Sequence, residues 1–296
     1  MNNSPHKVEL SDNEKTFIVN RKATCPFIAS AVSEGHLHVL NDARNPLASI
    51  DEVRELGNRG GGDLGDFLVH FATGNHAKMR GISEELDTSI SGEFFSLEFP
   101  GSQGSHPGHS GILQGDPTQL DSGRLSEADF ARLINHQQNG FIKRSDVGRF
   151  IAENLIRDPN SKVLDKNVAA LSVRNLSTVG KAIFSALKSK LVDSDEEASS
   201  RQRELEEKLT KLAATDNLIG SCGEFGLLFA FLINKPGARE ISDEPALDVQ
   251  DLKSMFVDKR LPEGWETWKK LRIDWVKNTF ALALAAGKEY RRLKGA

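Results

Sequence analysis

The stretch GSCGEFGLLFAFLIN, residues 220 to 234, contains a nearly continuous apolar run that begins directly after Glu224. Apolar residues at three- and four-residue spacing indicate a helix that packs one face inward, and about eight segments of the chain show it. Ser126 and Asp248 stand where they would begin two helices. β-branched alternation is scarce, so strands should be minor and the predicted fold is all-α. The expected helical segments are residues 25–35, 63–74, 126–137, 144–156, 177–191, 201–220, 223–234 and a long final one from near Trp265.

Turn-rich stretches separate these segments. Residues 57–65 (GNRGGGDLG) and 99–117 (FPGSQGSHPGHSGILQGDP) are rich in the residues that mark turns and loops. A loop longer than about 12 residues without secondary structure is usually disordered or functional, so residues 99–117 are a candidate site. We expect residues 1–20 to form an N-terminal extension and residues 21–296 to form a single, mostly helical domain.

The composition favours a soluble globular protein, because 38 % of the residues are hydrophobic and 27 % are charged. A net charge of −4 without a basic block gives no electrostatic basis for nucleic-acid or anionic-membrane partners. The first 20 residues lack the features of a signal peptide, and no apolar run approaches the roughly 20 residues that span a bilayer. We therefore predict a cytoplasmic protein whose two cysteines stay reduced and whose partners are small molecules or proteins.

Cys25 is followed directly by Pro26. Proline is favoured in the first turn of a helix, which would place Cys25 at or just before the N-cap. There the free backbone N–H groups and the helix dipole favour a thiolate. Such a thiolate could attack a substrate, coordinate zinc or bind haem iron from the proximal side. For a Cys-Pro pair taken alone, a buried inert thiol is the simplest interpretation.

Two histidine pairs, His36 with His38 and His106 with His109, have spacings that suit metal ligands. Such pairs in loops are most often solvated side chains. A nucleophilic cysteine needs a histidine base close by, but no cysteine-protease or transferase signature surrounds Cys25. Structural zinc sites need four ligands, commonly with paired cysteines, and the two cysteines of this chain are isolated in the sequence.

Glu224 is a lone carboxylate at the head of an apolar run. In the first turn of a helix it would be a capping residue. If it faces an apolar cavity instead, loss of solvation would raise its pKa, which suits a group that accepts and returns a proton near neutral pH. The residues alone leave both interpretations open.

Three stretches together resemble the haem-thiolate peroxidase family of chloroperoxidases and unspecific peroxygenases. Residues 24–45 are similar to the family's opening motif of Cys-Pro, a short apolar helix, a glycine turn and Gly-Arg-Asn or a close variant. Residues 220–234 resemble its Gly-Glu at the head of an apolar helix, and residues 256–268 its aromatic-x-x-x-Arg-Leu-Pro…Gly-Trp segment. The motifs occur in the family's order. The matching residues are Cys25, Pro26, Gly35, Arg44, Asn45, Gly223, Glu224, Phe256, Arg260, Leu261, Pro262, Gly264 and Trp265.

The resemblance implies a mostly helical, chloroperoxidase-like fold that encloses one haem b. Cys25 would be the axial thiolate ligand of the iron, and Pro26 and Phe27 would contact the cofactor beside it. Glu224 would be the distal acid-base residue. The implied activity uses hydrogen peroxide to oxidise or oxygenate a small apolar or aromatic substrate.

Two features depart from the family pattern. The family binds a divalent cation beside a haem propionate through an acidic motif followed by serine, whereas residues 108–111 (GHSG) keep only the histidine. Since hard cations need oxygen ligands, we expect the Mg²⁺ or Mn²⁺ site to be lost. His109 stands where short family members place a distal histidine and would orient Glu224 by hydrogen bonding. Long members have an arginine at the position of Asn217, so the pairing of His109 with Glu224 is the expected one.

Three hypotheses follow for the function. The first is a haem-thiolate peroxidase or peroxygenase with a pocket lined from the region of Phe225, Phe229 and Phe231. The second is a haem enzyme without peroxide chemistry, such as a lyase, dehydratase or isomerase, which the altered segment at residues 108–111 motivates. The third is a sensor or scaffold that has kept the fold and lost catalysis, with haem bound without turnover or no haem at all.

Overall fold

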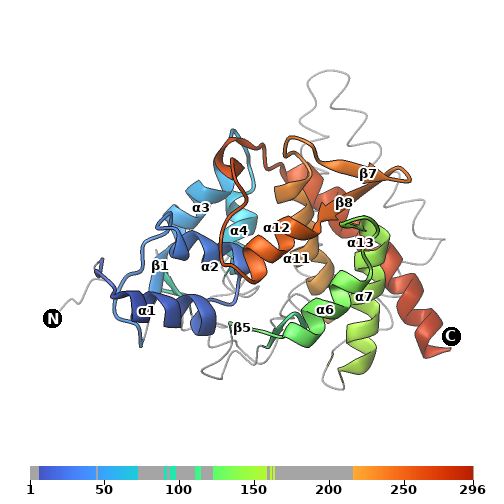
Figure 1. Cartoon of the computed structure of the whole chain (residues 1–296), viewed down its shortest axis with the longest axis horizontal. Helices are drawn as coiled ribbons and strands as arrows, with labels where there is room; N and C mark the ends of the chain where they lie inside the picture. Colours follow the sequence, from blue (N-terminus) through green and yellow to red (C-terminus); the bar gives the residue numbers. More distant parts are fainter. Residues whose placement is uncertain are drawn as a thin grey trace.

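A computed structural model describes residues 7–44, 46–72, 90–91, 94–97, 111–114, 123–158, 161, 163 and 216–295 (Figure 1). Over these ranges the chain forms nine α-helices and three small antiparallel sheets. The prediction of a mostly helical protein with minor strands is therefore confirmed.

Helices supply most of the described structure. The α-helices are α1 (Asp12–Phe17), α2 (Pro26–Ser33), α3 (Ile50–Asn58), α4 (Gly65–Ala72), α6 (Glu127–Asn135), α7 (Arg144–Arg157), α11 (Asn217–Leu232), α12 (Val249–Phe256) and α13 (Arg272–Lys294). A π-helix, Ile18–Lys22, follows α1, and a 3₁₀-helix, Trp265–Thr267, precedes α13.

The sheets are short and join neighbouring segments. In the first, β3 (Phe94–Ser96) lies between β1 (Leu47–Ser49) and β2 (Ile90–Ser91). In the second, β4 (Leu113–Gln114) pairs with β5 (Arg124–Leu125). In the third, β8 (Glu244–Asp248) lies between β6 (Phe141–Lys143) and β7 (Arg239–Ile241), with Ile142 opposite Leu247.

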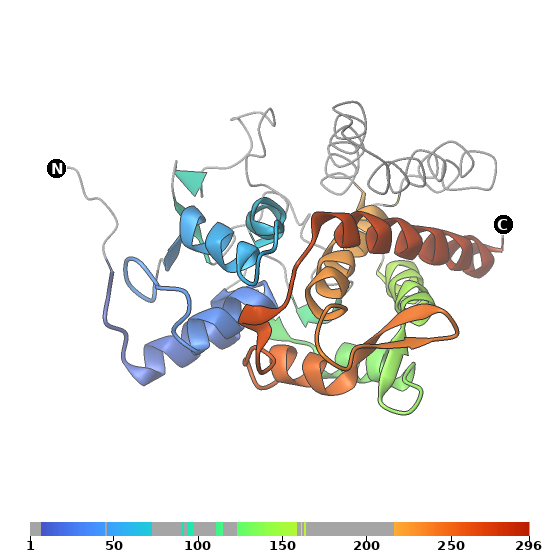
Figure 2. The same cartoon turned by 90° about the horizontal axis from the view of Figure 1, so that it is seen from above.

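Helices α7, α11 and α13 pack together in the C-terminal half of the chain (Figures 1 and 2). Glycines set how closely they approach. A Cβ atom at Gly226 of α11 would overlap Oγ1 of Thr279 and lie 3.0 Å from the backbone nitrogen of that residue on α13. A Cβ atom at Gly148 of α7 would lie 2.6 Å from Cβ of Ala285. Both positions therefore need a residue without a side chain.

The N-terminal half, seen at the blue end of Figure 2, contains α1 to α4. Every α2 residue from Pro26 to Val32 is buried, and α12 of the C-terminal half packs against this helix. Ile18 and Val19 of the π-helix also belong to the core, where the buried side chains of both halves form one cluster. The start of α2 is thus enclosed by residues from distant parts of the sequence.

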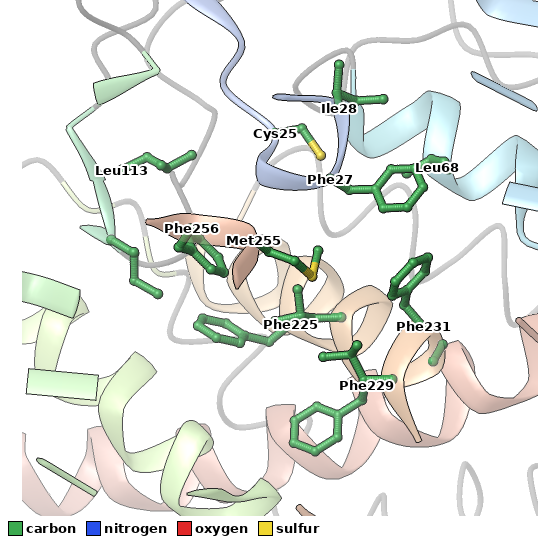
Figure 3. Close-up of a cluster of buried hydrophobic side chains, with 14 of the residues drawn as sticks. Cys25, Phe27, Ile28, Leu68, Leu113, Phe225, Phe229, Phe231, Met255 and Phe256 are labelled. Atoms are coloured by element: carbon green, nitrogen blue, oxygen red, sulfur yellow. The ribbon is translucent and has the colours of Figure 1, made fainter. Parts of the chain in front are cut away.

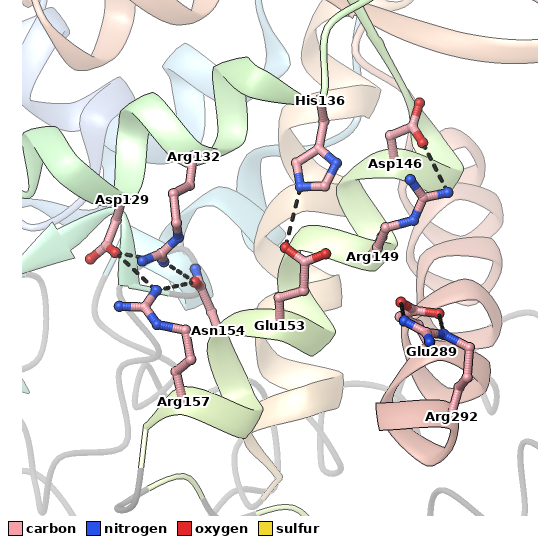
Figure 4. A network of polar contacts seen from close by, with 10 residues as sticks. All are labelled: Asp129, Arg132, His136, Asp146, Arg149, Glu153, Asn154, Arg157, Glu289 and Arg292. Atoms are coloured by element: carbon pink, nitrogen blue, oxygen red, sulfur yellow. Dashed lines mark hydrogen bonds and ion pairs between the residues drawn. The ribbon is translucent and has the colours of Figure 1, made fainter. Parts of the chain in front are cut away.

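Polar contacts tie α6 to α7 on the outside of this core (Figure 4). Arg132 pairs with Asp129 at 2.6 Å and donates to the side-chain oxygen of Asn154. Arg157 lies 3.5 Å from the same aspartate. His136 pairs with Glu153 at 3.4 Å. These contacts fix the two helices and lie away from the start of α2.

The described helices confirm several sequence predictions and correct others. Ser126 accepts a hydrogen bond from the amide of Asp129, and Asp248 accepts one from the amide of Gln250, so both predicted helix starts are correct. The final helix begins at Arg272 rather than near Trp265, since Trp268 and Leu271 have extended backbone angles. Helix α11 runs unbroken from Asn217, although we expected two separate helices that divide near Gly220. The segments 177–191 and 201–215 lie outside the described residues.

Both cysteines, Cys25 and Cys222, are buried and carry free thiols. Over the described ranges, the helices are too short or too polar to cross a bilayer.

Candidate functional site

A cavity lies between the start of α2, the middle of α11 and helix α4. Its enclosed volume is about 30 Å³, room for roughly two water molecules. Its ionisable lining residues are Cys25, Glu224 and Lys270, and the other lining residues are apolar or glycine. The complete lining is Cys25, Pro26, Phe27, Gly57, Leu64, Leu68, Glu224, Leu227, Leu228, Phe231, Met255 and Lys270. The cavity therefore brings together the predicted residues Cys25, Pro26, Phe27 and Glu224.

Cys25 is the N-cap residue of α2, and Pro26 occupies the first helical position, as the Cys-Pro pair predicts. The thiol is 6 % exposed. Burial raises the pKa of Cys25 to about 11, against the opposing effect of the backbone N–H groups of Ile28 and Phe27. The sulfur makes no capping hydrogen bond within the helix. The amide donors at the start of α2 thus favour the thiolate, but burial outweighs them and keeps the metal-free thiol protonated at neutral pH.

Glu224 reaches the cavity from the interior of α11. The helix begins at Asn217 and is capped by Asp216, whose carboxylate accepts hydrogen bonds from the amides of Leu218 and Ile219. Glu224 is therefore not in the first turn, and the interpretation of this residue as a cap is wrong. Its side chain is 2 % exposed, and its negative charge contributes to the raised pKa of Cys25. The carboxylate and the thiol therefore lie close enough to interact.

One face of α11 forms a wall of the cavity. Glu224, Leu227, Leu228 and Phe231 line it, and their spacing of three, four and seven residues places them on one side of a helix. Phe225 and Phe229 are buried elsewhere in the core (Figure 3), and the ring of Phe225 lies 6.2 Å from that of Phe150 on α7. Of the three phenylalanines predicted to line the pocket, the structure thus places only Phe231 there.

The three motifs of the sequence meet beside this cavity. The ring of Phe27, from the first motif, lies 4.8 Å from that of Phe231, from the second. The indole of Trp265, from the third motif, lies 5.7 Å from Phe27 and 6.1 Å from Phe231. The carboxylate of Glu34, at the end of α2, accepts a hydrogen bond from the amide of Leu261 at 2.9 Å. Segments far apart in the chain are therefore held together at the site.

The far wall contains residues that sequence reasoning missed. Lys270 is fully buried, and its ammonium group donates hydrogen bonds to the carbonyl oxygens of Arg59, Trp265 and Trp268 at 2.8 to 3.2 Å. A Cβ atom at Gly62 would lie 2.6 Å from the carbonyl oxygen of Lys270, so the glycine-rich turn permits a close backbone approach. In the sequence, only the glycine-rich stretch at residues 57–65 pointed to this wall of the cavity.

None of the histidines that the structure describes lines the cavity. His109 and His106 lie outside the described residues, as do Gly108, Ser110 and Asn45. His38 pairs with Glu52 at 3.2 Å, and His36 lies 3.9 Å from Glu266. Neither His36 nor His38 lines the cavity, and Arg44 is exposed.

Comparison of this chain with protein-family models, curated proteins and solved structures finds no significant match.

Proposed function

We propose that the protein is a haem-thiolate enzyme that uses hydrogen peroxide to oxidise or oxygenate a small apolar or aromatic substrate. The observation that carries this proposal is that Cys25 and Glu224, from motifs far apart in the sequence, line the same apolar cavity. Peroxide activation of this kind needs a soft axial ligand and a proton-transfer group around one reaction space. These two residues supply that pair.

The donor groups fit haem better than they fit a nucleophilic cysteine. A catalytic nucleophile needs a lowered thiol pKa and an adjacent base, whereas burial raises the pKa of Cys25 to about 11, and no histidine of the described chain lines the cavity. A metal ion that binds the sulfur displaces the thiol proton, and its positive charge balances the negative charge of the thiolate. Pro26, Phe27 and Phe231 offer apolar contacts to a planar cofactor. The cavity as it stands does not accommodate a porphyrin, so haem binding requires its lining, including Phe27 and Phe231 whose rings lie 4.8 Å apart, to separate.

Haem held through Cys25 would supply the redox chemistry that cleaves the O–O bond. Glu224 would accept a proton from one oxygen of hydrogen peroxide and return it to the other, which would leave as water; the remaining oxygen atom would be transferred to the substrate or be reduced to water as the substrate is oxidised. Leu227 and Leu228, on the same face of α11, exclude bulk water and contact an apolar substrate. His109 would orient the Glu224 carboxylate, in the role that the family resemblance implies.

The test compares Glu224→Gln with Asp216→Asn in the haem-loaded full chain. Both variants remove a buried carboxylate from α11, but asparagine is a good N-cap and residue 216 does not line the cavity. We expect Glu224→Gln to lower peroxide-dependent oxidation of an aromatic probe about 10²- to 10⁴-fold and Asp216→Asn to keep wild-type activity. Full peroxide-dependent activity in Glu224→Gln would overturn the acid-base role. Haem-dependent turnover that needs no peroxide and persists in Glu224→Gln would favour a lyase, dehydratase or isomerase. Bound haem without any turnover in the wild type would indicate a non-catalytic protein.

A further inference from the structure

The cavity between α2, α4 and α11 is nearly closed. Its enclosed volume of about 30 Å³ holds roughly two water molecules, and Cys25 in its lining is 6 % exposed. A larger molecule therefore enters only if part of the wall moves. The part that moves should be the one whose displacement costs the least free energy.

The walls of the cavity differ in how they are packed. Every α2 residue from Pro26 to Val32 is buried, as are nearly all α11 residues from Leu218 to Leu232. By contrast, none of residues 58–63, the turn between α3 and α4, is buried. Segments with little apolar burial open at low free-energy cost. This turn is thus the part of the surroundings that moves most easily.

The two ends of the turn form a fixed base. A Cβ atom at Gly57 would lie 2.6 Å from Cα of Gly65, so α3 and α4 meet there without side chains between them. The side-chain oxygen of Asn58 accepts a hydrogen bond from the amide of Gly65 at 2.8 Å. Gly60 and Gly61, at the tip, have φ angles of 73° and 75°, which glycine adopts without strain. The tip is therefore free to change its backbone angles while the base stays in place.

Polar contacts attach the turn to the segment before α13, which passes beside it (Figure 1). The Lys270 ammonium group donates to the carbonyl oxygen of Arg59 at 3.2 Å. The amide of Asp63 donates to the carbonyl oxygen of Lys270 at 2.9 Å, and the amide of Arg272 to the Asp63 carboxylate at 2.6 Å. Lys270 also lines the cavity. Its side chain therefore lies between the exposed turn and the enclosed space.

The ammonium group of Lys270 is held mainly by its own segment. Its other two acceptors are the carbonyl oxygens of Trp265 and Trp268, and it lies 5.2 Å from the centroid of the Trp265 ring. If the turn moves away, the ammonium group loses its bond to Arg59 and keeps these partners. A charge-assisted hydrogen bond is stronger than a neutral one. This bond thus holds the turn closed, and breaking it does not strand the buried charge.

We propose that residues 58–63 are a movable wall through which molecules enter the cavity, and that Lys270 is the positioning residue that holds this wall closed. The inference goes beyond the proposed function, because it concerns access to the cavity and not the group bound there. Its test uses the full chain without hemin. The spectrum that tests haem ligation is a separate measurement, so each proposal can fail without the other.

The thiol of Cys25 reports opening of the wall, and that of Cys222 reports unfolding of the core. Both thiols are buried, but only Cys25 lines the cavity. Labelling by iodoacetamide at fixed pH is followed at each cysteine by peptide mass spectrometry, at several low urea concentrations. Local opening exposes little surface, so the rate at Cys25 should hardly depend on urea, whereas the rate at Cys222 should rise steeply.

The first pair of variants is Lys270→Met and Lys269→Met, and Lys269 is exposed. We expect Lys270→Met to raise the urea-independent labelling rate of Cys25 roughly tenfold and Lys269→Met to leave it unchanged. Loss of a positive charge from the cavity wall disfavours the reactive thiolate. Electrostatics alone would therefore slow the reaction, and a faster rate reports opening.

The second pair tests the turn itself. Asp63→Ala removes the acceptor of the Arg272 amide from an exposed position and should also raise the labelling rate of Cys25. Asp66→Ala removes an exposed carboxylate that pairs with Arg54 instead, and it should not.

Two results would overturn this inference. Labelling of Cys25 with the same steep urea dependence as that of Cys222 would show that the cavity opens only when the core unfolds. A urea-independent rate that neither Lys270→Met nor Asp63→Ala raises would show that the turn and Lys270 do not control access.

Discussion

Replacing Gly226 with alanine should test the packing that holds Glu224 in place. Gly226 lies two residues after Glu224 on α11, at a point where Thr279 of α13 approaches the helix closely. The new methyl group would overlap Oγ1 of Thr279 and lie 3.0 Å from its backbone nitrogen and 3.1 Å from its Cα atom. A change of side-chain rotamer can relieve the first contact only. The two backbone contacts require α11 and α13 to move apart.

The expected cost follows from two opposing effects. Overpacking a core by one methyl group typically costs about 1–3 kcal/mol, and backbone contacts place this case near the upper value. Alanine recovers about 1 kcal/mol through its higher helix propensity. We therefore expect the free energy of unfolding of Gly226→Ala to fall by about 2 kcal/mol, measured by urea denaturation of the cofactor-free chain.

Thr279→Ala supplies the internal control. Its hydroxyl oxygen is buried and makes no hydrogen bond to any described residue, so this change costs only the small cavity it leaves, about 1 kcal/mol. In the double variant the overlap with Oγ1 is gone. Its loss of unfolding free energy should therefore be smaller than the sum of the two single-variant losses by at least about 0.5 kcal/mol. Unchanged or increased stability in Gly226→Ala, or strict additivity in the double variant, would refute this account of the helix contact.

Two further predictions concern the walls of the cavity. Lys270→Met removes the ammonium group that binds three carbonyl oxygens, so the unfolding free energy should fall by roughly 3 kcal/mol; a urea midpoint equal to that of the wild type would contradict this. Because burial raises the pKa of Cys25 to about 11 from 9.0, the folded state holds that proton more tightly than the unfolded state. The Cys25 contribution to stability should therefore be complete below pH 9 and be lost as the pH rises toward 11. Urea unfolding across this range should show a steeper decline in the cofactor-free wild type than in Cys25→Ala, and equal slopes would count against the raised pKa.

The sequence predicts the helical character of the chain well, because most helices show an apolar face at regular spacing. It fails where tertiary contacts decide the outcome. Trp268 and Leu271 have extended backbone angles although the local composition suits a helix, because tertiary contacts bind the carbonyl groups of this stretch. The Trp268 carbonyl accepts from the Lys270 ammonium group, the Lys269 carbonyl from the side chain of Asn234, and the Lys270 carbonyl from the amide of Asp63. Residues 220–223 suggest a break in α11, yet the helix continues there, and the carbonyl of Gly223 accepts a hydrogen bond from the Trp275 indole of α13.

The site was predictable in part. The Cys-Pro pair and the lone carboxylate before an apolar run mark Cys25, Pro26 and Glu224 in the sequence. All three line the cavity. Whether Phe225 or Phe231 lines the cavity depends on which face of α11 turns toward it. The apolar run does not specify that face, because nearly every residue of the helix is buried. Lys270 carries no sequence signal, since lysines are ordinarily exposed. Its place in the cavity wall depends on its burial and on its three carbonyl acceptors.

The most direct test of the central claim is the absorption spectrum of the dithionite-reduced, hemin-loaded chain under carbon monoxide. Cys25→Ala and Cys222→Ala form a matched pair, because both remove a buried free thiol and only Cys25 lines the cavity. The account predicts a Soret band well to the red of that of a histidine-ligated haem in the wild type and in Cys222→Ala, and its loss in Cys25→Ala. The absence of a haem band, or a band that Cys25→Ala leaves unchanged, would contradict it and leave Cys25 as an inert buried thiol.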